Sequence, residues 1–265
     1  MIDSASRPSD PLVVRGLTVR YGRALALDDV SLAVPRGAVY VLLGRSGAGK
    51  TSLVRCLLGA LKPSSGEALL FGKKGWWTRR RALARIGVVQ PEQAGRIRLA
   101  SAHASQPEAL VFDEPASGLP PGVRRAILEE LSAHAAERHT AVLLATRDPA
   151  GLDGFATHVG ILNAGRLVVA SEAETLRRRF RRIRYANEIT DERTEYGREL
   201  DAFDAVRVKV RGWGVEAVVS NFDDEVFAAF AATAGVVDAR AEALTLEEIF
   251  GAAAGGAPPI VAPER

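Results

Sequence analysis

A glycine-rich stretch that follows an apolar run is the feature that most constrains this chain. Residues 44–52 read Gly-Arg-Ser-Gly-Ala-Gly-Lys-Thr-Ser and fit the pattern G-x-x-x-x-G-K-[ST]. The apolar run at 39–43 predicts a buried strand, and the pattern that follows predicts a helix over 52–58. A strand, a glycine-rich turn and a helix in this order form a cradle for phosphate groups. The alternative is a glycine-rich turn that fits the pattern by chance.

The residue types in this stretch suit the phosphates of a nucleotide. Glycines let successive backbone N–H groups turn toward a β-phosphate, and the helix N-terminus adds partial positive charge. Lys50 can reach the β- and γ-phosphates, and the hydroxyl of Thr51 is a ligand for Mg²⁺. The residues predicted here to bind nucleotide are Gly44, Arg45, Ser46, Gly47, Ala48, Gly49, Lys50, Thr51 and Ser52.

Two carboxylates at the end of a second apolar run complement this stretch. Residues 109–112 are apolar and lead into Asp113 and Glu114. Carboxylates at the end of a buried strand are costly unless they have partners or a task. Beside a phosphate cradle, Asp113 can hold Mg²⁺ and Glu114 can act as the catalytic residue that polarises a water for attack on the γ-phosphate. The alternative is a solvated pair that caps the following segment.

Composition narrows the class of protein further. The 265 residues are 47% hydrophobic and 25% charged, which is the ordinary balance of a globular protein. A net charge of +3 argues against nucleic acid as a partner. The lone Cys56 excludes an internal disulfide and suits a reducing cytoplasm. No run approaches the ~18 apolar residues of a membrane span, and the first residues show no signal-peptide pattern. We expect any membrane-spanning part to belong to another chain.

The positively charged residues are concentrated in two clusters along the sequence. Arg79–Arg81 lie near Lys73 and Lys74, and six arginines fall between Arg177 and Arg184. For both clusters we expect a solvated helix face, the alternative being a contact with an anionic membrane or a partner.

Strands and helices alternate through residues 12–170, and the character of the sequence changes beyond Ser171. The alternation predicts an α/β fold, a P-loop NTPase core of mostly parallel sheet flanked by helices, followed by a small α+β domain. The expected strands cover 12–20, 29–34, 39–43, 68–71, 86–89, 109–112, 140–145, 159–163, 167–170, 206–210, 215–218 and 236–240. The expected helices cover 52–58, 77–85, 96–105, 121–136, 225–233 and 244–250, with an arginine-rich helix after Ser171. The predicted parts are a disordered leader at 1–10, a nucleotide-binding domain at 11–180, the α+β domain at 181–254 and a disordered tail at 255–265.

The order of these motifs resembles the nucleotide-binding subunit of an ABC transporter. The resemblance covers about residues 12–170 and places Gly44–Ser52 at the Walker A loop and Asp113-Glu114-Pro115 at Walker B with its catalytic glutamate. It implies that Tyr21 stacks on adenine and that Gln90 is the Q-loop glutamine, which touches both nucleotide and Mg²⁺. The C-terminal part, ending in Leu246–Phe250, resembles more weakly the extension of ABC-2 type exporter ATPases.

The segment between Gln90 and Asp113 departs from the family pattern. Only 23 positions separate these residues, where the family inserts a helical subdomain, so that subdomain is largely missing. The family signature, Leu-Ser-Gly-Gly-Gln, falls in register on Val89–Gln93, and Gln90 therefore competes for two roles. Pro91 lacks an N–H, and the carboxylate of Glu92 disfavours a nearby phosphate. We expect that this chain cannot complete the ATP site of a partner subunit.

Two further positions depart from the pattern. Pro120 replaces the aspartate of the D-loop after Ser117-Gly118-Leu119, which removes a carboxylate and an N–H from the cross-subunit contact. Arg147 replaces the switch histidine. Arginine can still bind a phosphate but does not exchange a proton at neutral pH. We therefore expect Arg147 to bind nucleotide and the turnover of ATP to be reduced.

The resemblance as a whole implies an ATP-binding subunit, peripheral at the inner face of the plasma membrane, that works with ATP, Mg²⁺ and an integral-membrane permease. The resemblance further implies that this subunit hydrolyses ATP weakly, or with a partner in a homo- or heterodimer, to energise an exporter. The residues that depart from the family pattern are mainly those that the family donates to the ATP site of the opposite subunit. This asymmetry suits a heterodimer, and it equally suits a decaying gene. The alternative function is a non-hydrolysing, nucleotide-binding regulatory module of such a complex. A soluble ABC protein of the ribosome or DNA-repair kind is disfavoured, because the sequence has one cassette and no long heptad segment.

Overall fold

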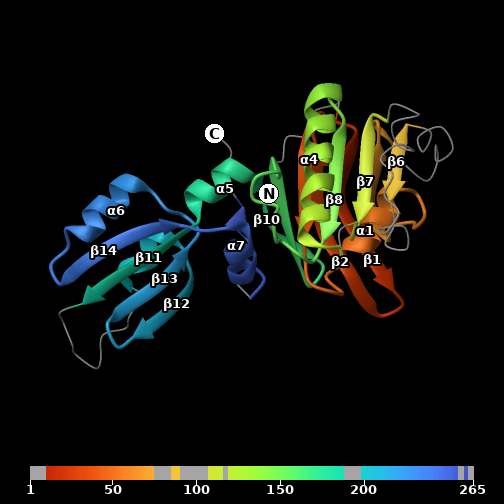
Figure 1. Ribbon diagram of the computed structural model, residues 1–265. Coiled ribbons are helices and arrows are strands. Elements are labelled where there is room, and N and C mark those ends of the chain that lie inside the picture. The colour runs from red at the N-terminus through yellow and green to blue at the C-terminus, as the bar shows by residue number, and fades with distance from the viewer. Residues whose placement is uncertain are drawn as a thin grey trace. The chain divides into compact units, whose positions relative to one another are not determined.

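The computed structural model describes residues 10–74, 85–89, 107–115, 119–187, 198–255 and 260–261. It divides them into two compact units, one running to Ser171 and including Val261, the other covering Glu172–Ile260 (Figure 1). The predicted bounds of the leader, the two domains and the tail stay predictions. Residues 260–261 of the predicted tail form a short strand.

Unit 1 contains two sheets and two described helices. The first sheet has the strand order β2-β1-β4-β5. The second has seven strands in the order β15-β10-β9-β3-β8-β7-β6. The elements of the first sheet are β1 (Leu12–Tyr21), β2 (Ala24–Val34), β4 (Ser65–Leu70) and β5 (Lys73–Lys74). Those of the second are β3 (Val39–Leu43), β6 (Ile86–Val89), β7 (Ala109–Asp113), β8 (Ala141–Thr146), β9 (His158–Asn163), β10 (Arg166–Glu172) and β15 (Ile260–Val261), and the helices are α1 (Lys50–Leu57) and α4 (Pro121–Arg138).

The centre of the second sheet is parallel, as the alternating sequence pattern predicts. Strand β3 pairs in parallel with β8 and β9, and β7 pairs in parallel with β8 and β6. All five residues of β3 and of β7 are buried, which is typical of strands covered on both faces. The predicted α/β fold class with a mostly parallel sheet is therefore confirmed, and strands 39–43 and 86–89 have the predicted bounds.

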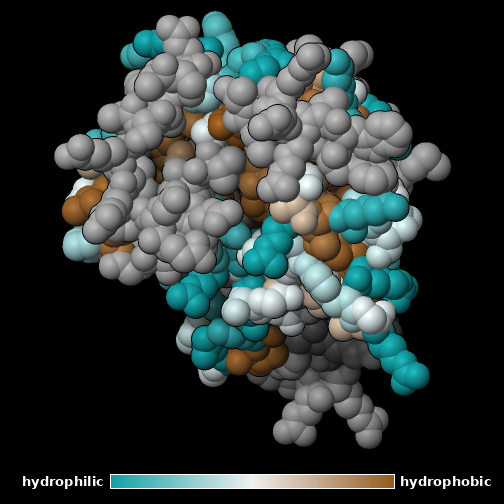
Figure 2. Space-filling model, turned by 90° about the vertical axis from the view of Figure 1, so that its right-hand side faces the viewer, coloured by the Kyte–Doolittle hydropathy of each residue, from teal (hydrophilic) through white to brown (hydrophobic). Residues whose placement is uncertain are grey.

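Helix α1 lies between the two sheets of unit 1. Its buried residues Leu53, Val54 and Leu57 share one core cluster with residues of β1 and β2 and with Leu143 of β8. On the face drawn in Figure 2, hydrophobic side chains form separate groups among hydrophilic ones. None of the described helices is long and apolar enough to cross a membrane.

Unit 2 is an antiparallel sheet with helices. Its strands are ordered β12-β13-β11-β14, and its core combines aliphatic residues with Tyr185, Phe203 and Phe230, whose rings pack edge to face. The strands are β11 (Arg181–Asn187), β12 (Ala205–Arg211), β13 (Gly214–Val219) and β14 (Val236–Ala243). The helices are α5 (Ala173–Arg179), the 3-10 helix η2 (Arg198–Phe203), α6 (Asp224–Ala231) and α7 (Leu246–Ala253).

One predicted element was wrong in kind, and several others differ from the structure in their bounds. The arginine-rich run does not form one solvated helix face, because α5 ends at Arg179 and Arg181–Asn187 form β11. Here Ile183 and Tyr185 are buried while Arg182 and Arg184 pair with glutamates, a period-2 pattern that the count of arginines hid. Strand β2 begins at Ala24 and not at Asp29, because its first residues pair with the end of β1.

Other predictions lie outside the described residues. Among these are the basic cluster Arg79–Arg81, residues 77–84 of the helix expected over 77–85, the helix expected over 96–105, Gln90, and Pro91–Gln93 of the signature position.

Glu108 joins the amino-terminal ends of three strands. It precedes β7 and accepts hydrogen bonds from Arg85, before β6, at 2.5 Å and from Arg36, before β3, at 2.9 Å. The hydrogen bond from Arg85 lowers the pKa of Glu108 most, burial opposes it, and Arg36 lowers the pKa further, to about 2.

We expect Glu108→Gln to lower the free energy of unfolding by about 1 kcal/mol at pH 7, a value reduced for the solvent exposure of the pair. The folded pKa of Glu108 lies below that of the unfolded chain. The stabilisation is therefore complete above about pH 4.5 and is lost as the pH falls toward about 2. Urea unfolding of parent and variant at pH 7 and pH 3.5 measures this, with Glu129→Gln in an exposed pair as control. An equal difference at both pH values would contradict it.

Candidate functional site

The glycine-rich loop connects the carboxyl end of β3 to the start of α1. The amide of Gly44 donates to the carbonyl of Thr146, at the end of the neighbouring β8, at 3.2 Å. Arg45, Ser46 and Gly47 are exposed, whereas Ala48 is buried. The loop therefore presents its tip to solvent while its two ends are fixed to the sheet.

Two glycines of the loop have no room for a side chain. A Cβ on Gly49, whose φ is +108°, would lie 2.5 Å from the carbonyl oxygen of Ala26 and 2.6 Å from Leu27 Cδ2. A Cβ on Gly44 would lie 2.8 Å from the carbonyl oxygen of Leu162. Gly47 also has positive φ, at +78°, but nothing lies within 4 Å of its Cβ position. The loop backbone is thus pressed against β2 and β9.

The N-terminus of α1 suits an anion. Gly49 is its N-cap and no side chain caps it, and its first turn contains no acidic residue. Helix N-termini carry partial positive charge and backbone N–H donors. The helix begins at Lys50, two residues before the predicted start, because the left-handed backbone of Gly49 turns the chain directly into it.

Lys50 is a buried cation, with 6% of its side chain exposed. Its Nζ donates to the carbonyl oxygens of Gly44 at 2.7 Å and Arg45 at 3.4 Å. It also forms an ion pair with Glu114 Oε1 at 3.3 Å. The loop and the end of β7 are therefore joined by one charge pair.

Asp113 is the last residue of β7 and is 6% exposed. Burial raises the pKa of its carboxyl and so does the charge of Glu114, while a hydrogen bond with Thr51 and the charge of Lys50 oppose this. Its Oδ1 is buried with no hydrogen-bond partner among the described residues.

These oxygens fit a hard divalent cation. A carboxylate oxygen without a partner beside a threonine hydroxyl is a donor set that suits Mg²⁺. Across the described ranges, no group of three His, Cys, Asp or Glu side chains is placed to hold a metal. An ion at Asp113 and Thr51 therefore needs ligands from water or substrate phosphates, which is how Mg²⁺ binds in phosphoryl-transfer sites.

Glu114 is held in a left-handed backbone conformation, with φ at +53°. Its amide donates to the carbonyl of Ala145, and its Oε2 accepts hydrogen bonds from Thr146 Oγ1 at 3.1 Å and from the amide of Arg147 at 3.3 Å. Non-glycine residues adopt this conformation at a cost of about 1–2 kcal/mol, and such strain is found often at functional sites. The carboxylate is thus fixed at both oxygens, by Lys50 and by the end of β8.

The other predicted residues that the structure describes, Tyr21 and Arg147, lie near this centre. Tyr21, the last residue of β1, is 47% exposed, and its hydroxyl lies 3.3 Å from Ser52 Oγ in α1. Arg147 is exposed at the end of β8. Gln90 lies outside the described residues. Apart from Gln90, all predicted site residues lie on the loop, on the start of α1, or at the ends of β1, β7 and β8.

Thr146 is a site residue that no motif in the sequence marked. Its hydroxyl donates to Glu114 Oε2, and only the strand order brings the two together. The available signal was that β7 and β8 are both buried runs ending in polar residues, because the carboxyl ends of parallel strands meet at one edge of a sheet.

Comparisons with known proteins agree on one family. The family model described as ABC transporter matches residues 27–94. The chain is 30% identical over 223 residues to a phosphonates import ATP-binding protein, PhnC 1, of Natronomonas pharaonis, covering 63% of this chain and 96% of that protein. It is 26% identical over 217 residues to the bacitracin transport ATP-binding protein BcrA of Bacillus licheniformis, covering 63% of this chain and 71% of that protein.

A solved structure shares the fold. The structure of cbiO1 from Clostridium perfringens, part of the ABC transporter complex cbiONQ, matches with a TM-score of 0.54 at 22% identity, over 63% of this chain and 90% of that one. The alignment with the phosphonates protein spans 223 positions but includes only 63% of this 265-residue chain. That relative therefore has residues at positions where this chain has none.

We expect Gly49→Ala to disrupt the loop. Its new methyl group would overlap backbone and add left-handed strain, so the free energy of unfolding should fall by about 3 kcal/mol. Gly47→Ala is the matched control, since it adds strain without overlap and should cost about 1 kcal/mol. Urea denaturation measures both, and equal losses in the two variants would refute this view of the loop.

Proposed function

This chain belongs to the ATP-binding proteins of ABC transporters, a family of P-loop ATPases, and from this premise we propose that Lys50, Asp113 and Glu114 form its ATP·Mg²⁺ site. The predicted role of ATP-binding subunit is thereby confirmed at the level of the family. The assignment of individual residues, of Mg²⁺, of the partner subunits and of the rate of turnover is our proposal.

The observation that carries the proposal is the meeting of the loop with the ends of β7 and β8. Lys50 contacts Glu114 at 3.3 Å, Thr51 contacts Asp113, and Thr146 contacts Glu114 at 3.1 Å. These residues come from three parts of the chain, so their convergence is a property of the fold. A buried cation and two carboxylates at one helix N-terminus are what phosphoryl transfer needs for positioning and charge stabilisation.

In this proposal the loop residues 44–49 and the N-terminus of α1 receive the phosphates through backbone N–H groups. Lys50 exchanges its carbonyl contacts for the β- and γ-phosphate oxygens. Tyr21, beside Ser52, offers an exposed ring on which adenine stacks. Arg147 adds a second cation at the γ-phosphate, since it is exposed next to Glu114.

Asp113 and Thr51 would hold Mg²⁺, with Gln90 as a third ligand by resemblance. When bound, such an ion would supply neutralisation of the negative charge on the phosphates. The unpartnered Oδ1 supports this assignment, because a buried carboxylate oxygen without a donor is costly.

Glu114 would orient the attacking water. The water oxygen forms a bond to the γ-phosphorus, the bond to the ADP oxygen breaks, and the water proton passes to the carboxylate and then to phosphate. Thr146 and the amide of Arg147 fix Oε2, so that Oε1 faces the lysine and the loop.

Turnover by the chain alone is proposed to be slow. Pro120, the N-cap of α4, and Val89–Gln93 stand where the family donates residues to the opposite ATP site. We propose that the chain dimerises with itself or with a second ATP-binding subunit that has an intact signature. We also propose that the dimer energises an exporter permease from the inner face of the plasma membrane. Export rests on the resemblance of the C-terminal part.

A phosphate-release assay with a nucleotide-affinity measurement tests the enzyme. We expect Lys50→Ala to weaken ATP binding at least about tenfold, and Glu114→Gln to retain binding but lower turnover about 10²-fold or more. Lys73→Ala and Glu129→Gln, both exposed and distant in sequence, are the matched controls. The non-hydrolysing module would be favoured if neither Lys50→Ala nor Glu114→Gln releases phosphate more slowly than the parent, while the parent still binds ATP.

Arg147→His tests the switch position. Histidine can exchange a proton near neutral pH, so phosphate release should rise about tenfold while ATP affinity changes less than about threefold. Arg147→Lys keeps the charge without that proton exchange and should not raise the rate. A rate for Arg147→His no higher than that of the parent would remove the proposed cause of slow turnover.

A further inference from the structure

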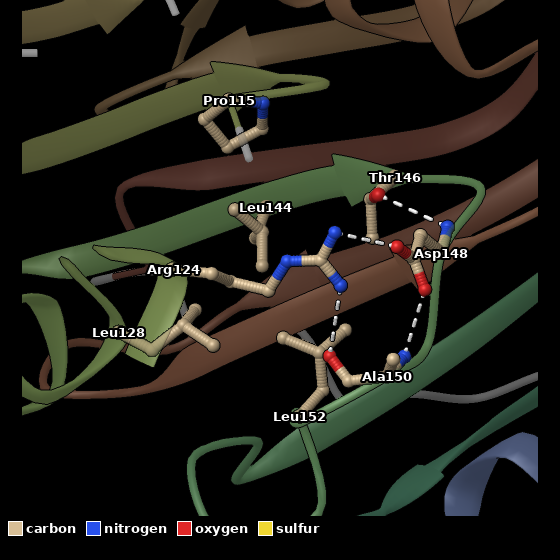
Figure 3. Close-up of a pocket in the computed structure, with 8 residues that line it drawn as sticks. All are labelled: Pro115, Arg124, Leu128, Leu144, Thr146, Asp148, Ala150 and Leu152. Carbon is tan, nitrogen blue, oxygen red and sulfur yellow. Dashed lines mark hydrogen bonds and ion pairs between the residues drawn. The ribbon is translucent and has the colours of Figure 1, made fainter. Parts of the chain in front are cut away.

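Arg124, near the start of α4, holds the turn that follows β8. Figure 3 shows its guanidinium directed at the carboxylate of Asp148 and the carbonyl of Ala150. The ion pair with Asp148 Oδ2 measures 2.6 Å and the hydrogen bond to Ala150 oxygen 3.4 Å. Both partners lie in the segment between β8 and β9, so one side chain connects a helix to that segment.

The surroundings of Arg124 differ from those of an ordinary surface arginine. Its side chain is only 16% exposed and lies in a small pocket with Leu128, Leu144 and Leu152. Its neighbour Arg125 is 76% exposed and pairs with Glu129 one turn along the helix. A cation kept among leucines needs its partner far more than a solvated one does.

Asp148 connects Arg124 to the site through hydrogen bonds. Its Oδ1 accepts from the amide of Ala150 at 3.0 Å, and its own amide donates to Thr146 Oγ1 at 3.1 Å. Burial alone would raise the pKa of Asp148, but the Ala150 amide and Arg124 outweigh it and hold the pKa below its usual range. Asp148 is thus a charged acceptor at neutral pH.

Thr146 completes the connection. Because its hydroxyl oxygen accepts from Asp148, its single hydrogen is free to be directed at Glu114 Oε2, 3.1 Å away. The amide of Arg147, between Thr146 and Asp148, reaches the same oxygen at 3.3 Å. Both donors to Glu114 Oε2 therefore lie where β8 ends and the turn restrained by Arg124 and Asp148 begins.

We propose that Arg124 and Asp148 are positioning residues that aim Thr146 and the Arg147 amide at the Glu114 carboxylate. This rests on the proposed role of Glu114 in orienting the attacking water. Neither residue contacts the glycine-rich loop or Lys50 in the interactions described above, so they act on turnover and not on nucleotide affinity. The pair also makes the placement of Glu114 depend on the first turns of α4.

Arg124→Met keeps the length and apolar stem of the side chain and removes its charge. We expect amide hydrogen exchange in the 147–150 segment to become about tenfold faster, and phosphate release per molecule of chain to fall about tenfold. ATP affinity should stay within about twofold of the parent. Arg125→Met is the matched control and should change none of the three quantities.

Two further variants separate positioning from a general loss of structure. Arg124→Lys keeps the charge and should restore turnover part of the way, because a lysine cannot reach both acceptors as the guanidinium fork does. In a Glu114→Gln background, measured by single turnover, Arg124→Met should cause little additional loss. Thermal unfolding by circular dichroism verifies that each variant is folded.

The proposal is overturned if exchange at 147–150 is unchanged, if exchange rises while turnover does not fall, or if Arg124→Met costs as much with Gln at position 114 as with Glu. Absence of ATP binding by the parent would instead overturn the proposed function. In that event the exchange comparison, which needs no nucleotide, still decides whether Arg124 restrains the turn.

Discussion

The ion pair between Lys50 and Glu114 is the interaction on which the described site depends. Lys50 is the first residue of α1 and Glu114 follows the last residue of β7, so the pair connects the loop to a different strand. Burying an ammonium group without a counter-charge is costly. The carboxylate removes that cost and also occupies the position from which, by our proposal, it acts on water.

The backbone around the pair is built to hold it. Glu114 adopts a left-handed backbone conformation, and its amide and both carboxylate oxygens have partners. Gly44 and Gly49 bring the loop so close to β9 and β2 that no side chain fits. The strain at Glu114 is therefore compensated by the contacts of its own amide and carboxylate. A network with its partners in place can bind phosphate with little rearrangement, which is the advantage of preorganisation.

We propose that this chain keeps the motifs of one half of an ABC ATP site and departs from those of the other half. The cis elements, from the loop to Asp113 and Glu114, match the pattern and lie together in the fold. By the resemblance to the family pattern, Val89–Gln93 and Pro120 stand at the trans positions and do not match it. On our proposal, the chain keeps the groups that hold a nucleotide and lacks N–H groups and a carboxylate that would act on a partner's nucleotide. Our proposal of a slow or partner-dependent ATPase follows from this difference.

The sequence by itself determined the elements whose signal is local. The glycine-rich loop, the buried strand 39–43 before it and the acidic end of β7 could be read directly, because glycine spacing and apolar runs constrain the chain within a few residues. It could not separate the arginines of α5 from those of β11, since charge density hides a period-2 pattern. Only the tertiary structure placed Thr146, Asp148 and Arg124 around Glu114. These residues are brought together by the parallel order of β7 and β8 and by the packing of α4 beside them, and strand order depends on long-range pairing that no local pattern encodes.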